Sequence, residues 1–173
     1  TASFQEAVAA AAGTLTNFAY EATSGWAGSG SPSDPTCLVG DGVDDFVTFG
    51  DLPAADFGTG PFTVRYWFRL NAAVPRDVVP LGGKKVGAQG WTLGVNAAMH
   101  LVGYAGESAS DYRQQTGGTT LVINRWYHAT MVRDAAGEIA LYLAGVAETL
   151  TPAGTVGAWN VSSAGDLTLF EVG

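Results

Sequence analysis

The amino-acid sequence predicts an all-β fold in which two antiparallel sheets pack face to face. Short apolar runs with strand-like alternation recur along the chain, and clusters of Gly, Pro, Asn and Asp separate them. Few segments favour a long helix, and the chain contains 24 glycines. Its 173 residues, 47% hydrophobic and only 14% charged, are sufficient for one domain with a buried two-sheet core.

The segment from Asn124 to Val146 is predicted to form a β hairpin. Two β-compatible runs, Trp126 to Arg133 and Glu138 to Ala144, flank a short loop that closes on Gly137. Glycine accepts the positive φ that a tight turn needs. In the second run apolar side chains occupy every second position, which predicts a strand with one buried face.

Other strands are expected wherever a short apolar run is bounded by turn residues. They are Cys37 to Val39, Phe46 to Phe49, Phe62 to Leu70, Val78 to Leu81, Trp91 to Val95, Met99 to Tyr104, Thr119 to Ile123 and Leu167 to Val172. Near the N-terminus, Gln5 to Ala12 favours a short helix, and Ser24 to Pro35 has the composition of a loop or linker. We therefore divide the chain into a helical or extended arm with its linker, residues 1–35, and a sandwich domain, residues 36–173.

Three segments in order resemble one protein family. Gly40 to Val47 reads D-G-x-D-D, an aromatic residue and Val, and Pro61 to Phe68 contains F-T-V-x-x-W. The hairpin reads R-W-Y-H, a hydrophobic strand, R-D-x-x-G and I-x-L-Y-L-x-G. Together they resemble laminin-G-like domains of the concanavalin A-like lectin and glucanase type. The resemblance implies a two-sheet antiparallel jelly roll, a fold that hosts lectins, adhesion domains, glycosidases and structural virion or cell-wall proteins.

The sequence departs from this family at its C-terminal end. The family pattern has a further strand after the position of Leu169 to Gly173, whereas this sequence stops there. An unpaired sheet edge favours pairing with another strand. We therefore expect the edge at Leu167 to Val172 to be completed by the N-terminal arm or by another subunit.

Charge and cysteine content restrict the partners and the compartment. A net charge of −8 disfavours nucleic acid and anionic membrane surfaces, which attract Lys and Arg. The single cysteine, Cys37, allows no internal disulfide; it is expected to be structural and indicates a reducing compartment. No apolar run is long enough to cross a bilayer, and Ala7 to Ala12 lacks the basic leader of a signal peptide.

The strand Phe62 to Leu70 supplies the predicted ligand-binding residues. Its alternation places the aromatic and aliphatic side chains in the core and Arg65, Trp67 and Arg69 on the opposite, exposed face. A sugar ring would stack its C–H face on Trp67, and its hydroxyls would accept hydrogen bonds from the guanidinium groups. The alternative is a cation–π ladder that stabilises the sheet and binds nothing.

Asp41, Asp44 and Asp45 form an acidic turn with two interpretations. Carboxylate oxygens are the ligands that Ca²⁺ prefers, and some members of the resembling family bind calcium. The spacing falls short of the regular alternation of an EF-hand loop. The alternative is a hairpin turn in which the Asp side chains accept hydrogen bonds from backbone N–H groups. No cofactor other than this Ca²⁺ is expected.

The sequence contains no recognisable catalytic arrangement. A retaining glycosidase needs two carboxylates about 5 Å apart, and an acid-x-acid-x-acid strand that would supply them is absent. Glu107 and Asp111 lie four positions apart in a loop, and Gly82 to Lys85 lacks the first Gly and the hydroxyl of a phosphate-binding loop. Trp126 is a packing residue by the resemblance, and His128 is expected to be half-buried rather than a ligand or a base.

These expectations combine into a non-enzymatic surface module. We predict an oligomeric bacteriophage virion protein, a head-decoration or tail-associated subunit, that attaches to other protein subunits or to a host glycan. The missing signal peptide, the single cysteine, the acidic charge and the open last strand motivate this prediction; a cell-surface or extracellular location is the alternative. A free-standing carbohydrate-binding module is the second interpretation, based on Trp67 between its arginines. A glycoside hydrolase is disfavoured because the carboxylates are missing.

Overall fold

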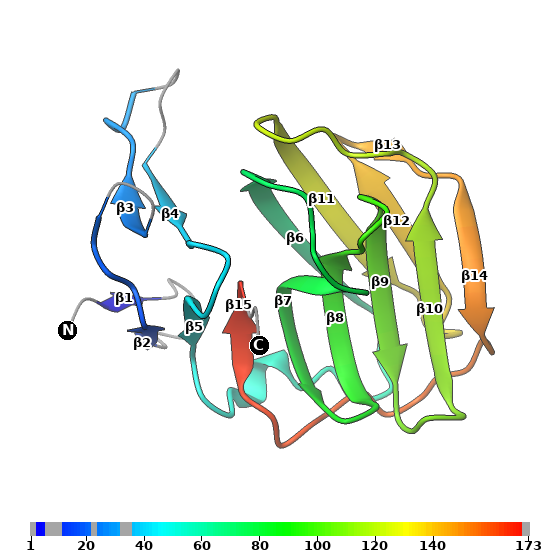
Figure 1. The fold of residues 1–173 in the computed structure, drawn as a ribbon. Coiled ribbons are helices and arrows are strands. Elements are labelled where there is room, and N and C mark those ends of the chain that lie inside the picture. The colour runs from blue at the N-terminus through cyan, green and yellow to red at the C-terminus, as the bar shows by residue number, and fades with distance from the viewer. Residues whose placement is uncertain (1–2, 6–11, 22–23, 32–35, 171–173) are drawn as a thin grey trace.

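The computed structural model describes residues 3–5, 12–21, 24–31 and 36–170, which form a large and a smaller antiparallel sheet and a two-stranded sheet beside them (Figure 1). The strands are β1 (Ser3–Gln5), β2 (Ala12–Thr16), β3 (Gly25–Ala27), β4 (Cys37–Val39), β5 (Phe46–Thr48), β6 (Phe62–Arg69), β7 (Val79–Val86), β8 (Gln89–Val95), β9 (Leu101–Gly106), β10 (Tyr112–Gly117), β11 (Trp126–Arg133), β12 (Ile139–Leu143), β13 (Val146–Ala147), β14 (Leu150–Gly154) and β15 (Leu167–Leu169). Only one short 3₁₀ turn, η1 (Pro53–Ala55), is helical among the described residues. None of their helices has the length and apolar character needed to cross a membrane. The predicted all-β sandwich is confirmed.

The larger sheet contains nine strands in the order β1-β2-β5-β15-β7-β8-β9-β10-β14. Within it β15 lies between β5 and β7, so that Leu169 faces Val47 on one side and Gly82 on the other. The expectation of an open edge at Leu167 to Val172 is therefore wrong for β15, while Val172 lies outside the described residues. The N-terminal strand β2 extends the same sheet on the far side of β5. We keep the division of the chain at residue 35 as a proposal.

The smaller sheet has the order β13-β12-β11-β6 and contains the predicted hairpin. β11 and β12 pair from Ala129 opposite Leu143 to Arg133 opposite Ile139. In the turn between them, the Asp134 carboxylate accepts hydrogen bonds from two backbone N–H groups at 2.9 Å. Gly137 has φ of 91°, the left-handed conformation predicted for this position. The hairpin prediction is confirmed.

Three local expectations differ from the structure. Thr119 to Ile123 forms a loop, and the strand in this region is the preceding β10, whose polar sequence hid it. Part of the expected linker, Gly25–Ala27, forms β3 and pairs with β4. At the two ends of the expected helix, Gln5 belongs to β1 and Ala12 to β2, which pair with each other; the residues between them lie outside the described part.

The buried apolar side chains form two separate clusters. The main cluster fills the space between the two large sheets and includes Phe62 and Phe68 of β6, Trp91, Leu93 and Val95 of β8, Ala129 and Met131 of β11, and Ile139, Leu141 and Leu143 of β12. The second cluster consists of Leu15, Phe18 and Val47, with Leu38, Phe49, Leu169 and Phe170 packed against it. The core is therefore continuous between β8, β11 and β12, and a separate, smaller core lies beside the N-terminal strands.

Candidate functional site

The outward face of β6 carries the residues that the sequence analysis singled out as ligand-binding. Arg65, Trp67 and Arg69 are exposed, and 71% of the Trp67 surface is accessible to solvent. Phe62 and Phe68 on the opposite face are buried in the main core. Because each strand residue alternates in direction, the core anchors this strand while the Trp67 ring remains free to contact a ligand.

The register between β6 and β11 adds two further residues to this face. His128 lies opposite Trp67, with the ring centres 5.0 Å apart and the planes inclined by 40°. Trp126 lies opposite Arg69, whose guanidinium carbon is 5.7 Å from the centre of the indole ring. Trp126, for which the resemblance implied a packing role, is 36% exposed and packs against the Arg69 guanidinium on this outer face. This face is therefore an aromatic platform with cationic hydrogen-bond donors beside it.

Sequence reasoning missed Trp126 and His128 as members of this face. Both residues lie on a strand on which nearly every position is apolar or aromatic, so its alternation alone does not show which side is buried. The structure orients the strand: Tyr127 and Met131 point inward, whereas Trp126 and His128 point outward. Only the pairing with β6, which lies about 60 positions earlier in the chain, determines that they join Trp67.

Asp41, Asp44 and Asp45 meet in the turn between β4 and β5. One carboxylate oxygen from each lies within 4.8 Å of the others. Asp45 Oδ2 accepts a hydrogen bond from the Asp41 N–H at 2.8 Å, and Asp41 Oδ1 accepts one from the Val43 N–H at 2.8 Å. These bonds agree with the predicted turn chemistry. Asp45 is only 1% exposed, however, and its Oδ1 has no hydrogen-bond partner within the described part of the chain.

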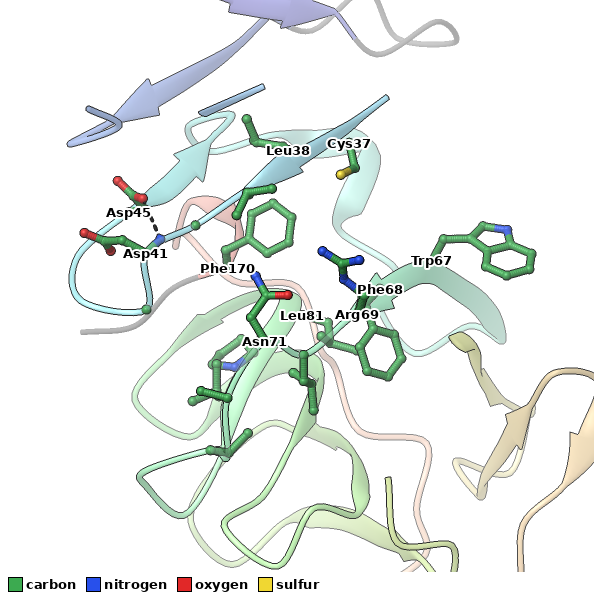
Figure 2. Close-up of a pocket in the computed structure, with 18 of the residues that line it drawn as sticks. Cys37, Leu38, Asp41, Asp45, Trp67, Phe68, Arg69, Asn71, Leu81 and Phe170 are labelled. Carbon is green, nitrogen blue, oxygen red and sulfur yellow. Dashed lines mark hydrogen bonds between the residues drawn. The ribbon is translucent and has the colours of Figure 1, made fainter. Parts of the chain in front are cut away.

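A cavity of about 910 Å³ connects these two groups of residues (Figure 2). Trp67 and Arg69 line it on one side, Asp41 and Asp45 on the other, while Arg65 is not part of the lining. Figure 2 shows the Trp67 ring directed away from the cavity and the Arg69 side chain extending toward it. Residues from both predicted sites thus meet at one recess, which the sequence analysis did not foresee.

The carboxylates considered for catalysis stabilise loops instead. Glu107 Oε2 accepts a hydrogen bond from the Asn160 N–H at 3.1 Å. Asp111 Oδ2 accepts one from the Ser108 hydroxyl at 2.7 Å. Each carboxylate therefore holds a neighbouring segment in place, in the way that turn-forming Asp and Glu side chains commonly do.

The fold and the sequence together define the class of protein. The structure is the laminin-G-like, concanavalin A-like sandwich that the sequence resemblance implied, and residues 41–169 match the family model described as the concanavalin A-like lectin/glucanases superfamily. The chain belongs to this superfamily. A comparison with curated protein sequences finds no match.

Several solved structures share the fold at low sequence identity. The binding domain of Paraclostridial Mosquitocidal Protein 1 aligns with a TM-score of 0.59 and 14% identity over 74% of this chain and 33% of that one. The botulinum neurotoxin serotype C1 binding domain aligns with a TM-score of 0.53 and 14% identity over 84% of this chain and 33% of that chain. A botulinum neurotoxin type C structure, described as dependent for cell entry on interaction with two ganglioside molecules, aligns with a TM-score of 0.51 and 14% identity over 83% and 33%. This chain spans about a third of the length of these proteins, and the similarity shows the fold alone.

Proposed function

We propose that this domain is a non-catalytic binding module that holds a saccharide on the outward face of β6 and β11. The observation that carries the proposal is the exposed Trp67 ring, flanked along β6 by Arg65 and Arg69 and across the sheet by His128. A sugar ring stacks its C–H face on an exposed indole, and guanidinium donors bind hydroxyl or carboxylate oxygens. Structural neighbours named for binding gangliosides and for a complex with SialylT support an acidic sugar as the first ligand class to test.

The test measures binding to a glycan array that includes sialylated glycans and then compares two single-tryptophan variants on the best glycan. Trp67→Ala should weaken binding about five- to thirtyfold, equivalent to about 1–2 kcal/mol of lost stacking. Trp26→Ala is the matched control, because Trp26 is also an exposed tryptophan, 49% accessible, but lies on β3. Unchanged affinity in a folded Trp67→Ala variant would refute the proposed binding face. Hydrolysis of a bound glycan would refute the proposal that the module is non-catalytic.

A second candidate function is attachment to another protein at a virion or cell surface, with this chain as one subunit of an oligomer. The observation that favours it is that β4 and β6, two of the strands at sheet edges, each have a side that no described strand covers. Such edges bind extended segments of other chains by backbone hydrogen bonds. Pull-down of virion or surface proteins on the immobilised domain tests this function, and failure to retain any of them would count against it.

We also propose that Asp41, Asp44 and Asp45 hold a Ca²⁺ ion. The unpartnered Asp45 Oδ1 fits this group, because a buried carboxylate oxygen without a donor is costly unless a cation or water satisfies it. Ca²⁺ accepts several oxygen ligands at about 2.3–2.6 Å in a flexible geometry, which oxygens gathered within 4.8 Å can approach. When bound, the ion would fix the turn between β4 and β5 beside the cavity.

A further inference from the structure

β4 and β6 are two of the six strands that lie at a sheet edge within the described residues. β6 is the last strand of the smaller sheet and pairs only with β11; β4 pairs only with β3. Every second residue along such an edge directs its N–H and C=O groups away from the existing partner. Within the described residues, the free sides of β4 and β6 therefore present backbone donors and acceptors that no strand uses.

Residues of both β4 and β6 line one cavity. The cavity has a volume of about 910 Å³. Cys37–Val39 of β4 line one wall, and the end of β6, from Trp67 onward, lines the other. In Figure 1 the β3–β4 pair stands beside the sandwich on the side where β6 is the edge. The cavity is therefore an open trough between two strands rather than a pocket within one sheet.

The floor of the trough is apolar and lies between the two core clusters. Phe68, Val74 and Leu81 come from the main cluster, whereas Leu38 and Phe170 belong to the second one. Large apolar side chains that face a cavity rather than one another lose packing contacts. An occupant with apolar side chains on its inward face would join the two clusters into one continuous core.

These features together specify the chemistry of the occupant. Two facing backbone edges need a ligand that donates and accepts hydrogen bonds on both sides at a regular spacing, which an extended polypeptide does and a sugar or an acyl chain does not. The apolar floor requires apolar side chains at every second position. The charged groups differ between the two sides, with Arg69 beside β6 and Asp41 and Asp45 after β4.

We propose that this trough receives an extended strand from another protein, which pairs with β6 and β4 at the same time. The inserted strand carries apolar side chains at alternate positions, an acidic residue near Arg69 and a basic residue near Asp41. Pairing on both sides converts the β3–β4 sheet and the four-stranded sheet into one continuous sheet. The proposal rests on the second candidate function, for which it names the partner, and the trough shares Trp67 and Arg69 with the proposed saccharide-binding face.

The test uses synthetic peptides about seven residues long, close to the usual strand length. The pool carries Val, Ile, Leu or Phe at alternate positions and Lys and Glu at opposite ends, in both orders, with a fluorophore for anisotropy. A second pool has the same side chains but N-methyl groups on alternate backbone nitrogens, which removes the donors to one of the two strand edges. We expect saturable binding of the first pool and at least tenfold weaker binding of the second, about 1.4 kcal/mol.

Cys37 provides a second, independent readout because it is the chain's single cysteine and lines the trough. Bound peptide from the first pool should slow maleimide labelling of this thiol about tenfold, and the N-methylated pool should not. Ala72→Trp introduces bulk at an exposed residue of the lining and should reduce peptide binding. Ala136→Trp, in the exposed turn after β11, is the matched control and should leave it unchanged.

Three results would overturn the proposal. They are equal binding of the two peptide pools, labelling of Cys37 at the same rate with and without peptide, and a dimer in light scattering whose Cys37 is protected in the absence of peptide. The last result would assign the trough to a second copy of this chain. A pull-down of intact surface proteins with the Ala72→Trp variant separates this inference from the second candidate function. If the variant captures a surface protein but does not bind the peptides, the attachment function stands and the trough is not its site.

Discussion

At the scale of single residues, Lys84 is a wholly buried cation held by two partly exposed carboxylates. Its Nζ lies 2.6 Å from Asp51 Oδ1 and 2.8 Å from Asp56 Oδ1, and it donates a hydrogen bond to the Leu52 carbonyl at 3.1 Å. Burial works against the charged Lys84, but hydrogen bonds to the carboxylates outweigh it and raise its pKa. Burial likewise opposes the charged Asp56 carboxylate, but hydrogen bonds from Lys84 and from the Ser163 N–H lower its pKa.

These opposite shifts predict a stability that falls at both ends of the pH range. The Asp56 contribution is complete above the ordinary carboxyl pKa of 3.8 and is lost as the pH drops through the lower value in the folded protein. The Lys84 contribution is complete below 10.5 and is lost as the pH rises through the higher folded value. We expect Lys84→Met to reduce stability by about 2 kcal/mol near neutral pH and to flatten both losses.

Urea denaturation across this pH range measures the effect. Lys85→Met is the control, because the neighbouring Lys85 is exposed and its Nζ lies 4.6 Å from the centre of the Tyr104 ring; we expect a change below about 1 kcal/mol. Equal pH profiles for the Lys84→Met variant and the unmodified protein would show that this ion cluster does not control acid and alkaline stability.

The calcium proposal also belongs to the residue scale. If Asp41, Asp44 and Asp45 bind Ca²⁺, then adding it at about one hundred times its dissociation constant should stabilise the fold by about 2.7 kcal/mol and raise the melting temperature. Asp45→Asn should abolish the increase, because Asp45 supplies the buried, unpartnered oxygen. Differential scanning fluorimetry with Ca²⁺ and Mg²⁺ measures it, and the exposed Asp77→Asn is the control. An unchanged melting temperature at millimolar Ca²⁺ would show that the three carboxylates form the turn without binding the ion.

At the scale of elements, the β11–β12 hairpin depends on the glycine at its turn. Gly137 combines a φ of 91° with a position at which an added Cβ would collide with the backbone oxygen of Gly157. We expect Gly137→Ala to cost more than about 2 kcal/mol, since positive φ and backbone overlap add. Gly145 has a similar φ of 81° but open space around it, so Gly145→Ala should cost only about 1 kcal/mol. Chemical denaturation of both variants measures the difference. Equal losses in the free energy of unfolding would show that the backbone at Gly157 moves away to accommodate the added Cβ.

The sequence predicts those elements whose burial follows a local alternation. β6 and β12 each have one apolar face against the core, so their positions and the exposure of Trp67 follow from the residue pattern. β10 was missed because its Arg113 and Gln115 do not pack in an apolar core but bind Glu138, at 2.8 and 2.6 Å. The convergence of Trp126, His128 and the acidic turn on one region depends on pairing between distant segments, which no local pattern encodes.

At the scale of the whole molecule, the divided core predicts two levels of stability. The main cluster is held by strands of both the nine-stranded and the four-stranded sheet, whereas the second contains three buried residues within the described part of the chain, Leu15, Phe18 and Val47. Because local opening costs less where fewer apolar contacts are lost, amides of Leu15 and Val47 should exchange with solvent at an opening free energy at least about 2 kcal/mol below those of Leu93 and Met131. Native-state hydrogen exchange measures this, and a single opening free energy throughout would indicate one cooperative unit.

The uncovered margins of β4 and β6 also bear on how the purified protein should be stored. A strand margin with free backbone groups can recruit the same margin of further molecules, so crowded samples would tend to polymerise with time. The net charge of −8 opposes such growth by mutual repulsion, which added electrolyte weakens. We expect the longest shelf life in dilute buffers of low ionic strength, and fibre formation to begin soonest in concentrated, salty stocks.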